Sequence, residues 1–188
     1  MKAQINNLAP LQQVAHIPQQ VHADNGVLKT RLTDHVVEDE IHEANKIFPP
    51  KDKLSYKVFL VGFKHVVPRK NVAYTNGFNV LFSNKTGTNY PPWNASPSDW
   101  SEVRLQDHHK DQVRNIRVHT GSYSYVRMIE LFGLDGTLLL RAGDVEGEVV
   151  KDFELQQGER IIGVQGYNED GDKDAWIRDI QFVIGRLE

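Results

Sequence analysis

The stretch IRVHTGSYSYVRMIELFG, residues 116–133, is followed by a second stretch of the same design, IIGVQGYNEDGDKDAWIRDIQFVIG, residues 161–185. In both, an Ile-x-Val segment leads through a glycine and a loop into the pattern aromatic, β-branched, Arg, any residue, Ile. Superposing Ile116 on Ile162 and Ile129 on Ile180 gives offsets of 46 and 51 residues, because the second loop is longer and acidic. Each copy is interpreted as a strand, a loop and a second strand, which predicts a duplicated piece of scaffold.

A third and fainter copy precedes these two. YKVFLVGF, residues 56–63, and NGFNVLFS, residues 76–83, keep the rhythm of strand and glycine but lack the aromatic-x-Arg element. Turn residues separate the apolar runs, which predicts strands at 56–63, 77–83, 101–105, 113–120, 125–132, 137–141, 150–154, 160–167 and 175–185. We therefore expect residues 54–188 to form a single all-β domain in which several similar sheets share one core.

These repeats resemble the jacalin-like lectins. The resemblance covers about residues 100–185 and rests on IRVHTGSYSYVRMIELFGLDGTLL and DFELQQGERIIGVQGYNEDGDKDAWIRDIQFVIG. In that family an Ile-x-Val-x-x-Gly strand precedes a hairpin, a DG turn closes a strand, and a GE turn starts the final strand pair. The resemblance implies a β-prism of three Greek-key sheets around a pseudo-threefold axis, together with carbohydrate binding.

The sequence departs from this family at the sugar site. The family usually holds the sugar with an Asp two residues before the Ile of the last strand, and Arg178 stands at that position. The internal copy has Arg127 there, and a guanidinium donates hydrogen bonds but accepts none. Sugar binding would then use a different site, with aromatic rings stacking on a pyranose. Its candidate residues are Tyr125, Tyr167, Asp174, Trp176 and Arg178.

The acidic loop of the second copy contains alternating oxygen ligands. Asn168, Asp170, Asp172 and Asp174 fall at every second position, and Ca²⁺ takes six or more oxygen ligands from such loops. The loop lacks the glycine at the sixth position and the flanking helices of an EF-hand. A calcium site and a solvated hairpin tip are both open alternatives here, and no other cofactor is expected.

The N-terminal part has a different composition. Residues 1–32 are rich in Gln, Asn and Pro, which predicts an extended, flexible tail that needs partner proteins to hold it. Residues 33–50 are expected to form one short amphipathic helix that ends at two prolines. Its apolar face, a candidate docking surface for partners, consists of Val37, Ile41, Ala44 and Phe48.

Composition narrows the functional classes. The chain has 188 residues and a net charge of −3 without long blocks of one sign, so neither nucleic acid nor a membrane is an expected partner. It has no cysteine, and its first residues lack the apolar core of a signal peptide. These features predict a protein that is not secreted and is cytoplasmic, cytoskeletal or ciliary.

The sequence contains none of the common catalytic motifs and leaves three classes of function open. No nucleophile elbow, HExxH motif or phosphate-binding loop is present, so we expect a protein that is not an enzyme. The main hypothesis is a structural or adaptor subunit of a larger assembly, which uses the tail and the β-domain as docking surfaces. The alternatives are a jacalin-like lectin that binds a glycan and, second, a calcium-binding β-domain.

Overall fold

The computed structural model describes residues 21–23, 26–36, 46–66, 78–86, 100–121, 126–143, 149–168 and 177–188, and these residues form three antiparallel sheets. The five-stranded sheet has the order β1 (Val21–Ala23), β2 (Gly26–Leu32), β12 (Ile177–Leu187), β11 (Arg160–Asn168), β3 (Lys46–Phe48). The four-stranded sheet has the order β10 (Val149–Glu154), β7 (Val113–Thr120), β8 (Val126–Gly133), β9 (Leu138–Ala142). The three-stranded sheet has the order β5 (Phe78–Phe82), β4 (Leu60–Val66), β6 (Trp100–Arg104).

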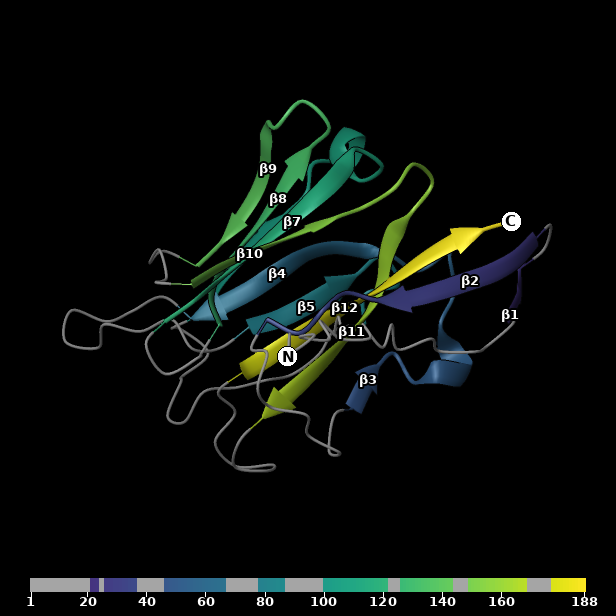
Figure 1. The fold of residues 1–188 in the computed structure, drawn as a ribbon, viewed down its shortest axis with the longest axis horizontal. Coiled ribbons are helices and arrows are strands. Elements are labelled where there is room, and N and C mark those ends of the chain that lie inside the picture. The colour runs from purple at the N-terminus through teal and green to yellow at the C-terminus, as the bar shows by residue number, and fades with distance from the viewer. Residues whose placement is uncertain are drawn as a thin grey trace, which may run out of the picture.

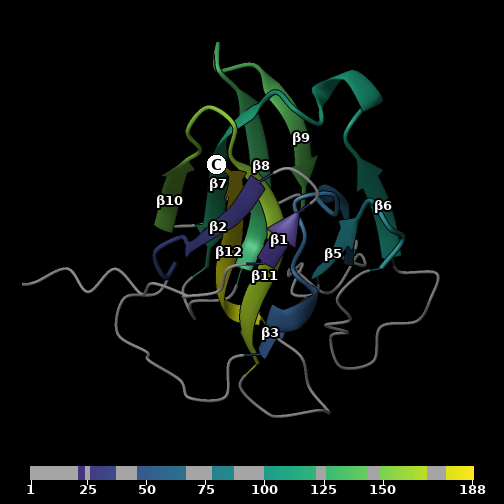
Figure 2. The ribbon, with the colours of Figure 1, turned by 90° about the vertical axis from the view of Figure 1, so that its right-hand side faces the viewer.

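This arrangement is the β-prism of jacalin-like lectins (Figures 1 and 2). The all-β prediction is confirmed, and each of the expected strands has a counterpart, the least accurate being 56–63, which appears as β4 at Leu60–Val66. Short 3-10 turns, Lys51–Lys53 and Asp107–His109, are the helical segments within the described ranges. The faint third copy is the pair β4–β5, which with β6 forms the third sheet.

One β-bulge recurs at the same place in the inner strand pairs β4–β5, β7–β8 and β11–β12. In β4–β5, Leu60 pairs with Phe82, one residue is passed over, and Gly62 pairs with Leu81. The other two pairs show the same shift near the start of β7 and of β11. The residues passed over are Val61, Arg114 and Ile162. A bulge increases local twist and bends its strand, so the same shape is imposed on all three sheets.

After the bulge, the matched register places equivalent side chains in one shared core. At three equivalent positions, each inner strand pair contributes an apolar side chain that is 0% exposed. They are Phe63, Val80 and Phe78 from the first pair, Ile116, Leu131 and Ile129 from the second, and Val164, Phe182 and Ile180 from the third. Burying each contributes roughly 1.5–3 kcal/mol, so this core is the main stabilising element of the domain.

The strand register shows that the match of Ile116 to Ile162, made from the sequence, is wrong by two residues. Ile116 lies opposite Leu131, and it is Val164, not Ile162, that lies opposite Phe182. Ile162 is the bulge residue and packs in a separate small cluster with Leu28 and Leu54. Matching Ile-x-Val by eye fails here because an extra residue shifts the alternation. The pairing of Ile129 with Ile180 as equivalent anchors is confirmed, since both lie in the shared core.

The N-terminal expectations need two corrections. Residues 26–32, assigned to the flexible tail, form β2 and pair with β12, with Leu28 buried. The expected helix is wrong at both ends, because residues 33–36 are not helical and Lys46–Phe48 is strand β3, paired with β11. Val37, Ile41 and Ala44 lie outside the described residues.

Phe48, predicted to lie on the docking face of a helix, is instead a partly buried strand residue that packs against the core. Its ring packs against Phe82 with the ring centroids 5.7 Å apart, whereas its neighbour Ile47 packs against the small cluster on the other side of the sheet. Successive side chains of a β-strand point to opposite faces of the sheet, as these two do. The apparent helical spacing that ends at Phe48 was therefore overridden by pairing with β11.

A substitution at Gly62 tests whether β4 and β6 approach each other too closely for a side chain beside the first bulge. A Cβ on Gly62 would lie 2.2 Å from the carbonyl oxygen of Val103 on β6. Gly62→Ala should therefore lower the free energy of unfolding by about 1–3 kcal/mol, the usual cost of overpacking, as measured by urea denaturation. The control is Asn115→Ala at the equivalent β7 position, where a Cβ is already present. Equal stability of the two variants would contradict this account.

Candidate functional site

The connections within the inner strand pairs leave the prism at one end. β4 ends at Val66, β7 at Thr120 and β11 at Asn168, and the matched register brings these strand ends to the same side. In Figure 1 the arrowheads of β4 and β11 both point toward the lower left. We call this side the hairpin end and the opposite side, where β4, β7 and β11 begin, the base.

Arg127 and Arg178, the repeated arginines, occupy equivalent bulges at the hairpin end. His119 pairs with Met128 and Thr120 with Val126, so Arg127 is passed over. Likewise Tyr167 pairs with Asp179 and Asn168 with Ile177, so Arg178 is passed over. The repeat noticed in the sequence thus reflects a shared backbone feature that interrupts the regular alternation of side chains.

The side chain of Arg127 crosses directly over Gly121. A Cβ placed on Gly121 would lie 2.6 Å from Nε of Arg127, so a larger residue at this position would displace the end of this arginine side chain. For Arg178 the structure describes the backbone position alone.

Asp179, the residue after Arg178, is buried and already engaged. Its Oδ1 accepts a hydrogen bond of 2.9 Å from the backbone N–H of Val36, and its Oδ2 contacts Nδ1 of His35. The side chain is 4% exposed. This carboxylate therefore serves an internal contact, and its burial leaves little of it accessible to a ligand in this conformation.

The residues after β2 are fastened along β12 by further hydrogen bonds. The hydroxyl oxygen of Thr33 accepts from the backbone N–H of Phe182 at 2.9 Å, and the N–H of Thr33 donates to the carbonyl of Phe182 at 3.0 Å. The side-chain amide of Gln181 donates to the carbonyl of Thr33 at 2.9 Å. These bonds and Asp179 hold residues 33–36 in place beside the hairpin end.

A second buried polar group lies on β8 at the position equivalent to Gln181. Glu130 accepts hydrogen bonds from Nε2 of His119 at 2.9 Å and from Nε of Arg141 at 2.8 Å. Burial alone would raise the pKa of Glu130, but the hydrogen bonds from His119 and Arg141 and the positive charge of Arg141 hold this pKa below its ordinary value. Glu130 is therefore a charged, paired carboxylate within the outer face of the four-stranded sheet.

The predicted site residues belong, by their positions in the sequence, to the two repeated hairpins. Tyr167 and Asn168 are the last residues of β11, and Arg178 is the second residue of β12, with their side chains not described. The remaining candidates, Tyr125, Asp170, Asp172, Asp174 and Trp176, lie outside the described residues. Tyr125 directly precedes β8 and Trp176 directly precedes β12, so these two aromatic residues stand at equivalent strand starts.

Within the described ranges, no cluster of three His, Asp or Glu side chains is arranged to hold a metal ion. None of the described helical segments is long and apolar enough to cross a membrane. The contacts of His35 and Val36 with Asp179 were not anticipated from sequence. They join residues 144 and 143 positions apart, and no local pattern signals such a pairing.

The fold is similar to several solved structures. No family model matches the chain, and it has no match among curated proteins. It is similar to PirB (13% identity, TM-score 0.53, covering 89% of this chain and 40% of PirB) and to a lamprey immune protein (10%, 0.50, 86% and 44%). A Malaysian banana lectin is also similar (11%, 0.50, 81% and 96%). The chain thus spans less than half the length of the first two proteins.

Asp179→Ala tests whether this carboxylate fastens residues 33–36. The variant leaves the N–H of Val36 without its acceptor, so the free energy of unfolding should fall by about 1–3 kcal/mol and amide exchange at Val36 should accelerate. The control is Asp152→Ala, which removes an exposed ion pair with Arg117 and should change stability by less than about 1 kcal/mol. Unchanged exchange at Val36 would refute the role of Asp179.

Glu130→Gln tests the charge of the buried carboxylate. Because the pKa of Glu130 is lower in the folded state than in the unfolded state, its stabilisation is present above its ordinary pKa of about 4.3 and is lost as the pH falls through the lower, folded value. The wild-type protein should therefore lose stability more steeply with acidification below about pH 4.3 than the variant does. Parallel pH profiles from urea denaturation would count against this pairing.

Proposed function

We propose that this chain is a carbohydrate-binding protein whose site lies at the hairpin end of the prism. The observation that carries the proposal is the repeated hairpin: β8 and β12 begin directly after Tyr125 and Trp176, at equivalent positions of a prism whose fold a banana lectin shares. Aromatic side chains at the starts of equivalent strands in two sheets offer apolar faces on which a pyranose ring can stack.

The hydrogen-bonding partners differ from those of the usual jacalin-like site. Asp179 is engaged by His35 and Val36, so the acceptor for sugar hydroxyls has to come from another residue. We assign this role to Asp174 in the connection between β11 and β12, with Arg178 as the donor. Tyr167 completes the proposed set as a second stacking residue. In this scheme Arg178 replaces the family's Asp, and Arg127 does so in the internal copy.

Other roles remain predictions. An adaptor in a cytoskeletal or ciliary assembly depends on the Gln- and Asn-rich residues 1–20, and calcium binding depends on the acidic residues after Asn168. Both segments lie outside the described residues. Carbohydrate binding is preferred because a lectin of similar fold and the aromatic residues next to described strands support it.

A glycan array followed by a tryptophan-fluorescence titration tests the proposal. Saturable binding of an oligosaccharide is expected, with Trp176→Ala and Asp174→Ala each weakening the affinity at least tenfold, or about 1.4 kcal/mol. The control is Trp100→Phe, which alters a tryptophan on β6 of the three-stranded sheet, a sheet that contains neither of the two repeated hairpins. Absence of any retained glycan, or undiminished affinity in Trp176→Ala, would overturn the proposal. Deleting residues 1–20 should leave glycan binding intact.

A further inference from the structure

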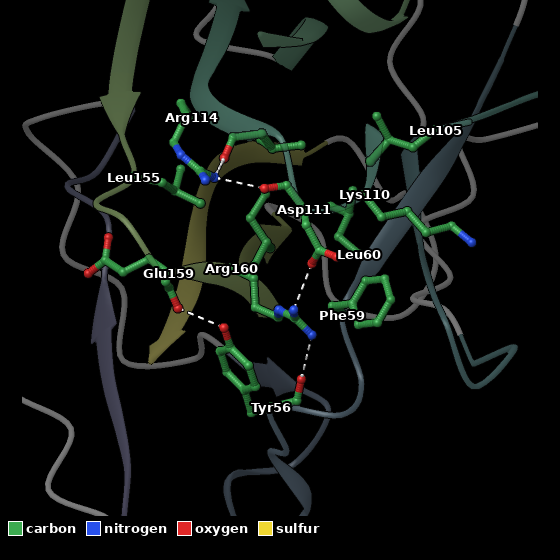
Figure 3. Close-up of a pocket in the computed structure, with 13 residues that line it drawn as sticks. Tyr56, Phe59, Leu60, Leu105, Lys110, Asp111, Arg114, Leu155, Glu159 and Arg160 are labelled. Carbon is green, nitrogen blue, oxygen red and sulfur yellow. Dashed lines mark hydrogen bonds and ion pairs between the residues drawn. The ribbon is translucent and has the colours of Figure 1, made fainter. Parts of the chain in front are cut away.

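A cavity of about 190 Å³ opens at the base of the prism, opposite to the hairpin end (Figure 3). Its floor is aliphatic. Leu60, Val113 and Ile161 come from β4, β7 and β11, each directly before the recurring bulge. These three side chains are at most 7% exposed, so the floor is the pseudo-threefold end of the core itself.

Two more leucines extend this floor, and each is held by the same kind of backbone hydrogen bond to a bulge residue. Leu105 follows β6 and Leu155 follows β10, and their backbone N–H groups donate to the carbonyls of Val61 and Arg114, the bulge residues of the adjoining strands, at 2.9 and 2.8 Å. Both side chains are nearly buried and line the cavity. The recurring bulges thus create an apolar depression that the protein's own side chains leave partly unfilled.

The carboxylates around the cavity are already neutralised. Glu159 accepts two hydrogen bonds from Arg31, at 2.9 and 2.6 Å, and one from the N–H of Gln156 at 2.8 Å. Burial would raise the pKa of Glu159, but these bonds hold it below its ordinary value. Asp111 accepts from Nη2 of Arg160 at 2.7 Å. A cationic ligand would therefore find no carboxylate without a partner among these groups.

Arg160 forms one wall of the cavity. Its guanidinium carbon lies 4.1 Å from the centre of the Tyr56 ring and 4.8 Å from that of Phe59, and its Nη1 donates to the carbonyl of Tyr56 at 3.3 Å. With Asp111 bound as well, this guanidinium is held in place by stacking and hydrogen bonds. Figure 3 shows it between Asp111 and Tyr56.

Arg114 differs from Arg160 because it has no carboxylate partner within the described part of the chain. Its Nη1 donates to two backbone carbonyls, of Asp111 at 3.0 Å and of Val113 at 2.7 Å. Lys110, on the same rim, pairs with Asp107, whose side chain is 95% exposed, so water screens this pair strongly. The rim therefore carries positive charge that is not balanced locally, above an aliphatic floor.

We propose that the base cavity binds a small monocarboxylate with an apolar body, of about the size of benzoate or hexanoate. An apolar cavity of about 150 Å³ is large enough for benzene, so the observed volume suits a ring or short chain of this size. The carboxylate would accept hydrogen bonds from Arg114, with Lys110 adding charge, because guanidinium–carboxylate bonds are among the stronger ones in proteins. The apolar body of the ligand would pack on the aliphatic floor formed by Leu60, Val113 and Ile161.

This site is independent of the proposed carbohydrate site. The two lie at opposite ends of the prism and share no residue, so either could exist without the other. An experiment on the base cavity therefore leaves the carbohydrate proposal untouched, and the reverse also holds.

Titration of the full chain with benzoate, followed by amide NMR shifts, tests the proposal. Saturable shifts at Leu60, Val113 and Ile161 are expected in the millimolar range. Benzamide, which has the same shape without the charge, should bind at least tenfold more weakly, and benzylamine should not bind. Equal affinities for benzoate and benzamide, or shifts that do not saturate, would overturn the proposal whatever the variants do.

Two variants locate the anion. Arg114→Gln should weaken benzoate binding at least tenfold, and Lys110→Gln should weaken it by a smaller factor. The control is Arg104→Gln, which alters an exposed arginine on β6 paired with Glu102 and should leave binding unchanged. Amide spectra of each variant establish that it is folded. Unaltered affinity in Arg114→Gln would refute the assigned carboxylate position.

Discussion

The recurring bulge near the start of β4, β7 and β11 is the constraint on which the rest of the prism depends. It bends three strands in the same way, so that the residues after it meet as one core without any exposure of their side chains. It also frees the carbonyls of Val61 and Arg114 for the N–H groups of Leu105 and Leu155, which draws the outer strands in over the base. Core, outer strands and cavity are consequences of one local geometry repeated three times.

Much of this fold could be predicted from the sequence, because strands with strong apolar alternation and clear turn residues at their ends can be recognised without a structure. The prediction failed where stability comes from pairing over long distances. β2 buries only one side chain completely, and β3 has only three residues, so neither has a recognisable pattern. The bulges could not be predicted for a related reason. An inserted residue such as Ile162 cannot be told from a regularly paired strand residue until the partner strand and its register are known.

The sequence predicted that the two repeated hairpins are equivalent, whereas the site residues assigned to them stay a prediction. The repeated arginines marked equivalent places, and both lie at register shifts beside the hairpins. The sequence could not reveal that the neighbouring Asp179 holds residues 33–36, because that contact joins distant parts of the chain. The base cavity was likewise hidden, since its lining comes from the starts of three strands and from two connections that no motif links.

The pairing of β2 with β12 has a consequence for how the protein is made. Thr33 and Phe182, which exchange hydrogen bonds beside this pair, are 149 residues apart in sequence. During synthesis, the sheets that contain β4 to β10 can assemble first. The backbone groups of β2 that pair with β12 have no partner until β12 has been synthesised. The five-stranded sheet can therefore close only after β12 has been synthesised, and until then β2 presents an open strand edge to other chains.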